Sequence, residues 1–260
     1  MTIDTTTTTF FHIPPYIFFA GIGLVVSIGV FIISLVIKRV QIDKFVIRLF
    51  VSLIFLVLCA KLFGIILNIV TALYTQQPIT KELLLNAGIV YYGGLIGFIS
   101  SFIIICKIKD KEVNMKALDS LSLAIPMFHA FGRIGCFFAG CCYGITCNNF
   151  LAVCYTNVID GTIVTANRLP IQLIEVAENI IIFIVLCVLS KLINKKGLIL
   201  PIYLMVYSIV RFINESLRAD WNRAMFGGIS MSQIISIILL IISVTVLIIN
   251  SKSKEKYTDG

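Results

Sequence analysis

Seven long apolar segments constrain this chain's fold more than any other feature of its sequence. A helix of roughly 20 apolar residues crosses about 30 Å of hydrocarbon. With 59% hydrophobic and only 13% charged residues, the chain does not resemble a water-soluble globular domain. We therefore predict an all-α integral membrane protein with seven transmembrane helices. The segments lie near residues 15–37, 46–72, 85–106, 117–140, 172–193, 197–217 and 229–250.

The basic residues between these segments predict how the chain is oriented. Thirteen lysines and arginines fall in alternate connections and only four in the others. Because cytoplasmic loops are enriched in basic residues, we expect the N-terminus outside and the C-terminus in the cytoplasm. The expected organisation is one membrane domain over residues 1–250, with a small extracytoplasmic head loop at about 144–169, and a cytoplasmic polar tail at 251–260. The net charge of +8 forms no basic stripe with interleaved aromatic residues, so we expect no nucleic-acid partner.

The fourth segment contains an arginine that needs a partner. Arg133 lies in the stretch HAFGRIGCFFAGCCYG, with no acidic residue between Ser120 and Ile159. A guanidinium within hydrocarbon is costly unless it faces a polar cavity, a partner or a ligand, which indicates a functional residue. Small residues recur every four positions, and on a helix they would form a smooth face for close packing. These residues are Gly132, Cys136, Gly140 and Gly144.

A second group of polar residues lies near the outer end of the sixth segment. Tyr207, Arg211, Glu215 and Arg218 are spaced at helical offsets and form one stripe, which we expect to face inward. One interpretation is a self-satisfied ladder that only holds the bundle together. The other is an anion site in which Arg133 and Arg211 clamp a phosphate by bidentate hydrogen bonds while Glu215 orients one of them.

Two further features add candidate site residues. His129 lies one helical turn before Arg133 and can act as a general base for a thiol or a hydroxyl, or it is a core histidine bonded to a backbone carbonyl. The stretch YYGGLIG holds Gly93 and Gly94, which permit close backbone approach, and Tyr92, which supplies a phenolic hydroxyl.

Taken together, these motifs resemble the prolipoprotein diacylglyceryl transferase family from about residue 85 to the last segment. YYGGLIG is similar to that family's His–Gly–Gly–Leu–Ile–Gly stretch. Asp119 followed fourteen residues later by GRIG matches its signature around a phospholipid-binding arginine. RLPIQLIE, which runs from Arg168 to Glu175, RFINESLRAD and GGISMSQIISI match three further elements in the family's order.

The resemblance implies transfer of a diacylglyceryl group from phosphatidylglycerol to the lipobox cysteine thiol of a prolipoprotein. The implied setting is the bacterial inner, or cytoplasmic, membrane, and the implied partners are phosphatidylglycerol, the preprolipoprotein signal peptide and the lipid bilayer. Neither a metal nor an organic cofactor is expected. The expected catalytic residues are His129, Tyr92, Arg211, Glu215 and Tyr207, and the expected substrate-binding residues are Arg133, Gly93, Gly94, Gly144, Arg168 and Arg218.

Several positions depart from the family pattern. Tyr92 stands where the family has a histidine, Cys136 where it has an asparagine and Cys141 where it has a glutamate. Tyrosine is a poor base at neutral pH, since its pKa is about 10, so His129 is the candidate substitute. Two other functions stay open: a related lipid transferase with a different donor or acceptor, and a phospholipid-binding homologue without activity.

The cysteines between the fourth and fifth segments also have more than one interpretation. They lie at or beyond the expected outer membrane surface, where disulfides persist, so one or two bridges can join the head loop. A metal site and an acyl-accepting thiol are the alternatives. The residues concerned are Cys141, Cys142, Cys147 and Cys154.

Overall fold

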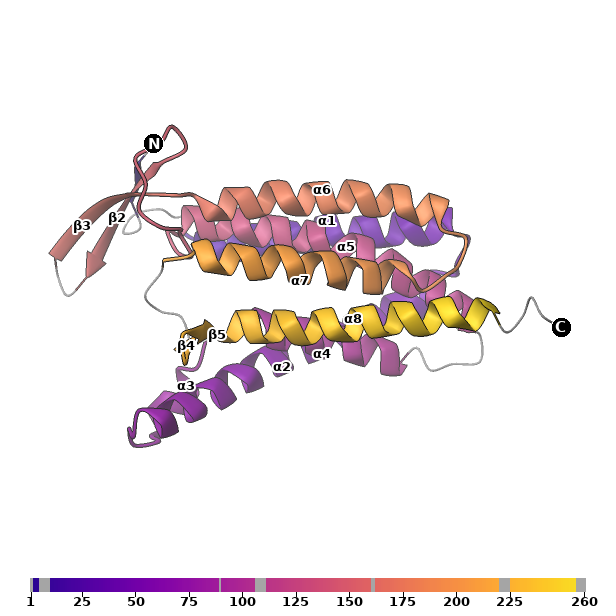
Figure 1. Ribbon diagram of the computed structural model, residues 1–260, viewed down its shortest axis with the longest axis horizontal. Helices are drawn as coiled ribbons and strands as arrows, with labels where there is room; N and C mark the ends of the chain where they lie inside the picture. The colour runs from indigo at the N-terminus through magenta and orange to yellow at the C-terminus, as the bar shows by residue number, and fades with distance from the viewer. Residues whose placement is uncertain are drawn as a thin grey trace.

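The computed structural model describes residues 2–4, 10–88, 90–105, 111–159, 162–219 and 225–255 of the 260-residue chain. Within these ranges the chain forms a bundle of long helices with two small sheets at one end (Figure 1). The helices are α1 (Pro15–Ile37), α2 (Asp43–Tyr74), α3 (Lys81–Leu85), α4 (Tyr91–Ile105), α5 (Lys111–Phe138), α6 (Ile171–Leu192), α7 (Ile199–Leu217) and α8 (Met231–Glu255). The strands are β1 (Thr2–Asp4), β2 (Val153–Ile159), β3 (Thr162–Arg168), β4 (Met225–Phe226) and β5 (Ile229–Ser230).

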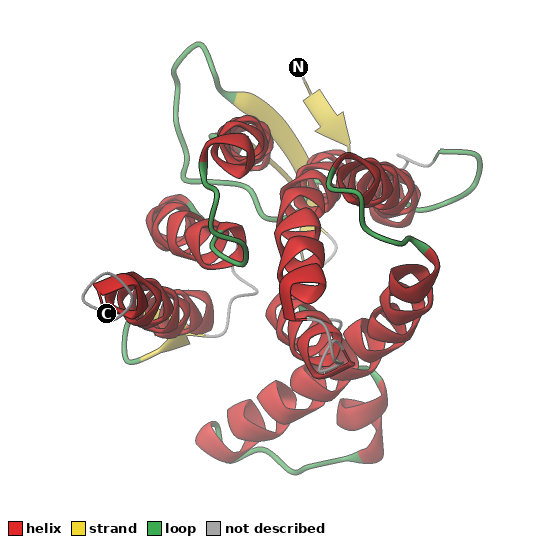
Figure 2. Cartoon of the chain, turned by 90° about the vertical axis from the view of Figure 1, so that its right-hand side faces the viewer, coloured by secondary structure: helices red, strands yellow, loops and turns green. Residues whose placement is uncertain are grey.

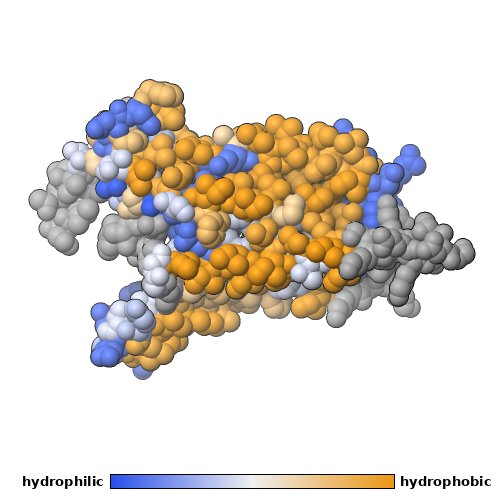
Figure 3. Space-filling view, viewed as in Figure 1, coloured by the Kyte–Doolittle hydropathy of each residue, from blue (hydrophilic) through white to orange (hydrophobic). Residues whose placement is uncertain are grey.

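Each of the seven predicted apolar segments contains a long helix. Five of these helices, α1, α2, α5, α6 and α8, are long and apolar enough to cross a membrane. Hydrophobic residues cover the middle of the face seen in Figure 3, and hydrophilic residues gather towards its ends. The prediction of a helical integral membrane protein is confirmed at this level. The 15-residue α4 and the polar α7 fall outside the five candidates.

Helix α5 lies at the centre of the bundle. It packs against α1, α6 and α7, whereas α2 pairs with α4 and α7 pairs with α8. Figure 2 shows the bundle from one end, so that several of its helices are seen nearly along their axes. In the apolar window of α5, 67% of the residues are buried within the protein, compared with at most 28% in the other four candidate spans. A helix with so little exposed surface can carry polar side chains into the interior of the bundle.

The small residues of the fourth segment do not form the predicted packing face. The helix ends at Phe138, so two of the four residues lie beyond it, and a Cβ built on Gly132 would meet nothing within 4 Å. Instead, Gly135 permits the close approach, because a Cβ there would lie 3.0 Å from the Cα of Tyr16 in α1. The prediction assumed a longer helix and a period of exactly four residues, and both assumptions are wrong.

Asp119, the first residue of the family signature, caps a neighbouring helix. Its carboxylate oxygens accept hydrogen bonds from the backbone N–H groups of Gly197 (2.8 Å) and Ile199 (3.0 Å). These groups lie at the N-terminus of α7, where backbone donors have no partner within the helix and a negative charge is favourable. Asp119 therefore fixes the start of α7 against α5.

The predicted head loop is a β-hairpin, which the all-α prediction did not include. Strand β2 pairs antiparallel with β3, and β1 adds in parallel to β2, with Thr2 opposite Cys154. Both strand sequences, VCYTNVI and TIVTANR, are rich in β-branched residues, which suit a strand. The polar and turn-forming residues in the middle of this segment indicated a loop in the sequence. Two of them, Asp160 and Gly161, lie outside the described residues. In the predicted tail, α8 continues to Glu255, and residues 256–260 also lie outside.

Candidate active site

Two buried arginines from different helices meet at one carboxylate. Arg133 of α5 forms an ion pair through its Nε with Oε2 of Glu175, a residue of α6. Arg211 of α7 donates through Nη1 to Oε1 of the same carboxylate, at 2.6 Å. Exposed fractions are 9% for Arg133, 4% for Arg211 and 2% for Glu175, so all three charges lie inside the bundle. The acidic partner that Arg133 lacks in its own segment comes from a helix further along the chain.

The ion-pair network continues along α7 towards the head. Arg211 donates through Nη2 to Oε2 of Glu215 at 2.6 Å, and Arg218 contacts the same oxygen at 3.3 Å. The predicted inward orientation of this stripe is confirmed by the burial of Tyr207, Arg211 and Glu215. Three guanidinium groups and two carboxylates leave one excess positive charge. Such a site attracts an anion.

The guanidinium of Arg133 is only partly paired. Among the described residues, none accepts a hydrogen bond from its Nη1 or Nη2 group, whereas both Nη groups of Arg211 are already occupied by carboxylates. A planar guanidinium presents its two Nη groups as a fork that matches two oxygens of a phosphate. The open edge of Arg133 is therefore the place in this network where an anionic ligand can bind.

His129 lies directly behind Arg133. The Nε–H of Arg133 donates to Nε2 of the imidazole at 3.2 Å, so His129 is neutral and has its lone pair on Nε2. The ring also contacts Tyr207 edge-on, with 5.2 Å between the ring centroids. Because Arg133 occupies the lone pair, His129 can accept a proton at Nε2 only after Arg133 has moved away.

Polar residues from the hairpin and from α6 fix the side of the site that faces the hairpin. Gln172 donates through Nε2 to the carbonyl oxygen of Cys141 at 2.6 Å and accepts from the hydroxyl of Tyr155 at 3.2 Å. Burial raises the pKa of Tyr155 above its ordinary value, although the hydrogen bond to Gln172 acts in the opposite direction. The hydroxyl therefore stays a donor, and strand β2 is tied to the first turn of α6.

The remaining predicted site residues lie in other surroundings. A Cβ on Gly93 would overlap Phe63 of α2, and one on Gly94 would lie 3.3 Å from Ala60, so both glycines line the contact between α4 and α2. A Cβ on Gly144 would lie 2.9 Å from the carbonyl oxygen of Leu169 and 3.1 Å from that of Leu217, so Gly144 is closely enclosed by backbone. The guanidinium of Arg168 stacks on Tyr143, 4.5 Å from the ring centroid. Tyr92 lies in the first turn of α4, and its side chain is outside the described part of the structure.

Three residues of the site were not among the predicted site residues: Glu175, Gln172 and Tyr155. A carboxylate within an apolar segment carries the same signal as an arginine there, so Glu175 could have been found by the reasoning that selected Arg133. Gln172 and Tyr155 carry no such signal, since single amides and phenols are common near helix ends.

An apolar cavity of about 130 Å³ lies between α1, α2, α4 and α5, and no residue of the ion-pair network lines it. It is enclosed by residues of α1, α2, α4 and α5, among them Ser27, Leu53, Phe98 and Phe128. Tyr16 lines it as well and contacts Gly135, which places one end of the cavity next to the last turn of α5.

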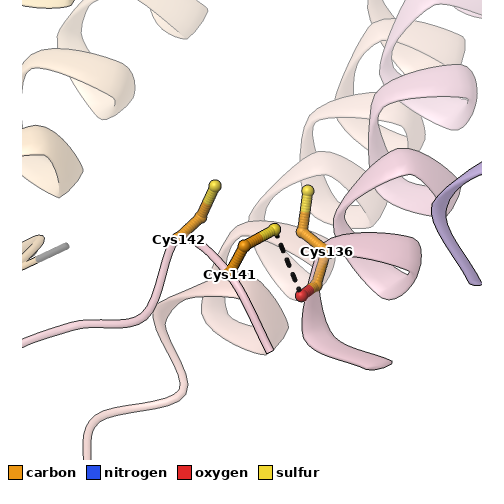
Figure 4. Close-up of side chains that lie close together, drawn as sticks. All are labelled: Cys136, Cys141 and Cys142. Atoms are coloured by element: carbon orange, nitrogen blue, oxygen red, sulfur yellow. Dashed lines mark hydrogen bonds between the residues drawn. The ribbon is translucent and has the colours of Figure 1, made fainter. Parts of the chain in front are cut away.

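Three cysteines also lie close together where α5 ends (Figure 4). The seven cysteines within the described ranges are free thiols, so the disulfides considered from the sequence are not formed there. Hydrogen bonds from Cys136 and Cys141 lower the pKa of the Cys142 thiol well below its usual value, burial opposes this, and the charges of Arg133 and Arg218 add to it. The hydrogen bonds with the other two thiols raise the pKa of Cys141.

A buried cluster of arginines and glutamates, within a bundle of helices of which five are long and apolar enough to cross a membrane, defines the class of an integral membrane protein. The family model described as prolipoprotein diacylglyceryl transferase matches residues 6–249, and this chain therefore belongs to that family. The resemblance seen in the sequence is confirmed.

Relatives named phosphatidylglycerol–prolipoprotein diacylglyceryl transferase align with most of the chain. The protein from Clostridium tetani is 32% identical over 76% of this chain and 78% of its own length. The protein from Clostridium novyi is 30% identical over 91% of this chain and 90% of its own length. A third, numbered 2 in Clostridium perfringens, is 30% identical over 94% and 93%.

Proposed function

We propose that this protein transfers the diacylglyceryl group of phosphatidylglycerol to the cysteine thiol of a prolipoprotein in the bacterial cell membrane. The names of its relatives support this donor and this acceptor. The observation that carries the proposal is the open edge of Arg133, held by Glu175 next to Arg211. A phosphate diester headgroup has the charge and the paired oxygens that this edge requires.

The chemistry is a displacement at the glycerol carbon of the donor. The thiol loses its proton to a base, the sulfur forms a bond with the carbon, and the carbon–oxygen bond breaks. The electron pair remains on the oxygen of the departing glycerol phosphate, and a thioether is formed. Arg133 stabilises the charge that develops on this phosphate, as preorganised donors stabilise developing charge in acyl and phosphoryl transfers.

His129 is the proposed base. In the resting arrangement its Nε2 lone pair accepts from Arg133. When a phosphate draws the guanidinium towards itself, this lone pair becomes available to the acceptor thiol. Substrate binding and activation of the base are then the same movement. Glu175 and Glu215 hold Arg211 in place beside the leaving group. The apolar cavity next to Tyr16 holds an apolar part of the donor lipid.

The proposed topology has seven spans, with α4 and α7 added to the five candidate helices. It places the N-terminus and the hairpin outside and the C-terminus in the cytoplasm. The alternation of basic connections along the sequence supports this orientation. The proposed partners are accordingly phosphatidylglycerol of the bilayer and a signal peptide that enters from the membrane, and the organisation is one membrane domain over residues 1–250.

The test is a transfer assay with the full chain in lipid nanodiscs that contain phosphatidylglycerol. A lipobox peptide should gain the mass of a diacylglyceryl group on its cysteine. We expect Arg133→Gln to lower the rate by about 10²–10³, the typical cost of losing one charge-stabilising donor. Arg133→Lys keeps the charge but loses the fork, so it should recover only part of the rate. Lys81→Gln, an exposed cation at the start of α3, is the matched control.

One observation favours a second candidate, a phospholipid-binding protein without turnover. The only described imidazole in the site is hydrogen-bonded to Arg133 rather than directed at a substrate. In that case phosphatidylglycerol would bind in an Arg133-dependent way, no peptide would gain mass, and His129→Gln would leave binding unchanged. Product formation that falls with His129→Gln would exclude it. A product on a different acceptor, found by lipid and lipoprotein profiling of a deletion strain, would indicate a related transferase.

A further inference from the structure

Three thiols converge where α5 ends. The Sγ atoms of Cys136, Cys141 and Cys142 all lie within 4.8 Å of one another. In Figure 4 the three side chains extend to the same side of the turn. Cys136 is buried, Cys142 is partly buried and Cys141 is exposed, so the group spans the boundary between the bundle and the outside. The transfer reaction proposed above uses none of these thiols.

The helix end explains why two of the three are close. The N–H of Cys141 bonds the carbonyl of Cys136 at 3.1 Å, and the N–H of Gly140 bonds that of Phe137 at 3.1 Å. With Gly140 at φ 64°, this is a Schellman motif, which ordinarily brings the side chains at the positions of Cys136 and Cys141 together. Their proximity alone therefore indicates no ligand.

The position of the third thiol is not explained by the motif. Cys142 has φ 61°, in the left-handed region that residues with a Cβ rarely adopt. The chain is held on both sides: the carbonyl of Cys141 accepts from Gln172, and Gly144 bonds through its N–H to Leu169 at 2.8 Å. A non-glycine residue kept in an unfavourable backbone conformation by its surroundings is a reason to look for a function.

The donor set specifies the ligand class. It consists of sulfur alone, without a carboxylate or an imidazole among its members. Thiolates select soft metal ions such as Zn²⁺ and Cu⁺. A zinc ion with Zn–S bonds of about 2.3 Å holds its sulfurs about 3.8 Å apart, so the three atoms need only a small contraction. A disulfide could join just two of them. Arg133, one turn before Cys136, offsets the negative charge of three thiolates around a dication.

We propose that Cys136, Cys141 and Cys142 form a three-thiolate site for one thiophilic metal ion, with a fourth coordination position open. Three protein ligands with one open position is the arrangement of a zinc site that can accept a further ligand. The ion would lock the turn between α5 and the hairpin to the end of α5. Because Gln172 holds the carbonyl of Cys141, the site is also connected to α6, three residues before Glu175.

The test uses the full chain in detergent, reduced and freed of metal with a chelator. Co²⁺, a spectroscopic substitute for Zn²⁺, should produce sulfur-to-metal charge-transfer absorption that saturates at one ion per chain. Added Zn²⁺ should displace it, and a parallel titration with Cu⁺ against a competing chelator distinguishes the two ions. Either ion bound at one per chain supports the site.

Single substitutions locate the ligands. Cys136→Ser, Cys141→Ser and Cys142→Ser should each lower the affinity by more than the roughly 10–100-fold that loss of an outer-shell partner costs. Cys147→Ser is the matched control, since this thiol follows the same helix but lies outside the group, and it should change the affinity by less than about twofold. Bound Zn²⁺ should also raise the melting temperature of the parent protein, by mass action, and not that of Cys142→Ser.

Three results would overturn the proposal. The first is the absence of charge-transfer absorption in the reduced protein, and the second is absorption that survives Cys142→Ser unchanged. The third is a disulfide between two of the three cysteines in protein whose free thiols were blocked before lysis. If Cys136→Ser does not fold, Cys142→Ser decides, because its thiol is only partly buried and its metal-free melting temperature should equal that of the parent.

Discussion

Glu175 is the residue on which the geometry of the candidate site depends. One carboxylate holds two guanidinium groups from two other helices, and it is itself almost fully buried. Removal of one partner from a buried ion pair leaves an uncompensated charge, which costs about 3–5 kcal/mol. The same change would release Arg133 from its fixed orientation. A substitution of Glu175 should therefore lower both the stability of the protein and its affinity for a phosphate group.

Glu175→Gln tests this dependence. Three guanidinium groups would then share the single carboxylate of Glu215, so we expect a loss of about 3–5 kcal/mol in stability and weaker binding of phosphatidylglycerol. The measurements are thermal unfolding in detergent, followed by circular dichroism, and lipid binding in nanodiscs. Glu178→Gln is the control, because Glu178 lies one turn along the same helix and accepts its hydrogen bond from the neutral amide of Asn214 at 2.5 Å. Equal losses in both variants would contradict the role given to Glu175.

Lys38, at the other end of the bundle, gives a prediction about pH. Burial lowers its pKa to about 8, although the nearby Asp119 acts in the opposite direction. Its Nζ has no hydrogen-bond partner among the described residues. In the unfolded chain the pKa of lysine is about 10.4. The unfolded state therefore binds more protons between these two values, and stability rises with pH in that window.

Lys38→Met should accordingly raise the melting temperature at pH values below about 8, where the folded protein carries a poorly solvated charge. The gain should shrink as the pH approaches about 10.4. Melting temperatures of parent and variant across the range measure the difference, so that other titrating groups cancel. Lys191→Met, a change at an exposed lysine, provides the baseline. A gain that does not vary with pH would mean that the buried charge is not its cause.

Single residues of the site could be predicted from the sequence where a charge lies in an apolar segment. That signal selects Arg133, Arg211 and Glu215, because their burial demands a partner or a ligand. It cannot say which charges meet. Arg133 and Glu175 are brought together only when α5 and α6 pack side by side. The hydrophobic periodicity of a helix does not predict which other helix it packs against.

At the scale of elements, the glycines of α4 are the clearest case of two possible roles. From the sequence we predicted that Gly93 and Gly94 bind substrate, whereas in the structure both residues pack against α2. A Cβ at Gly93 would lie 2.8 Å from the carbonyl oxygen of Cys59 and would overlap Phe63. Backbone atoms cannot withdraw as a flexible side chain can, so α4 would have to move away from α2.

Gly93→Ala should therefore destabilise the protein by about 1–3 kcal/mol, the usual cost of overpacking. Gly29→Ala is the matched control, because Gly29 lies in the interior of α1 with nothing within 4 Å of an added Cβ. Alanine there should stabilise the helix by about 0.5–1 kcal/mol. The readouts are the melting temperature and the KM for phosphatidylglycerol. A raised KM with an unchanged melting temperature would favour the substrate-binding role.

Helices and strands were not equally predictable. Hydrophobic length is a strong signal, and α1 coincides with the predicted segment at 15–37. The hairpin of β2 and β3 was missed, since polar residues such as Thr165 and Asn167, which are exposed, made its seven-residue strands resemble a loop in the sequence. Strand β1 could not be predicted at all, because its three residues pair with a strand about 150 positions away, starting at Cys154.

The whole molecule has two chemically different ends. Strand β1 and the hairpin lie at one end, and the C-terminal end of α8 extends from the other (Figure 1). The connection between α6 and α7, with Lys195 and Lys196, lies at the end away from the hairpin, because the hairpin precedes α6 and this connection follows it. Within the described residues, five helices meet the criteria of length and composition for a span, and α4 and α7 do not. The sidedness of the chain after α6 thus depends on α7.

A helix of 19 residues such as α7 is about 28 Å long at 1.5 Å per residue, close to the thickness of the hydrocarbon. Its charged residues are buried against α5 and α6 rather than exposed to lipid, so they do not prevent a crossing. We expect that α7 spans the membrane. Green fluorescent protein fused after residue 196 or at the C-terminus should then fluoresce, because it folds in the cytoplasm.

Alkaline phosphatase fused after residue 228, between α7 and α8, should in turn be active, because that connection would lie outside. Each position is tested with both reporters, so that one serves as the control for the other. If α7 did not cross, the fusion after residue 228 would fluoresce and the one at the C-terminus would not. Residue 196 is cytoplasmic in either pattern, so the head hairpin, which lies on the other side of α6, is outside in both. Only the first pattern places α7 across the membrane beside α6, as the ion pair between Arg211 and Glu175 requires.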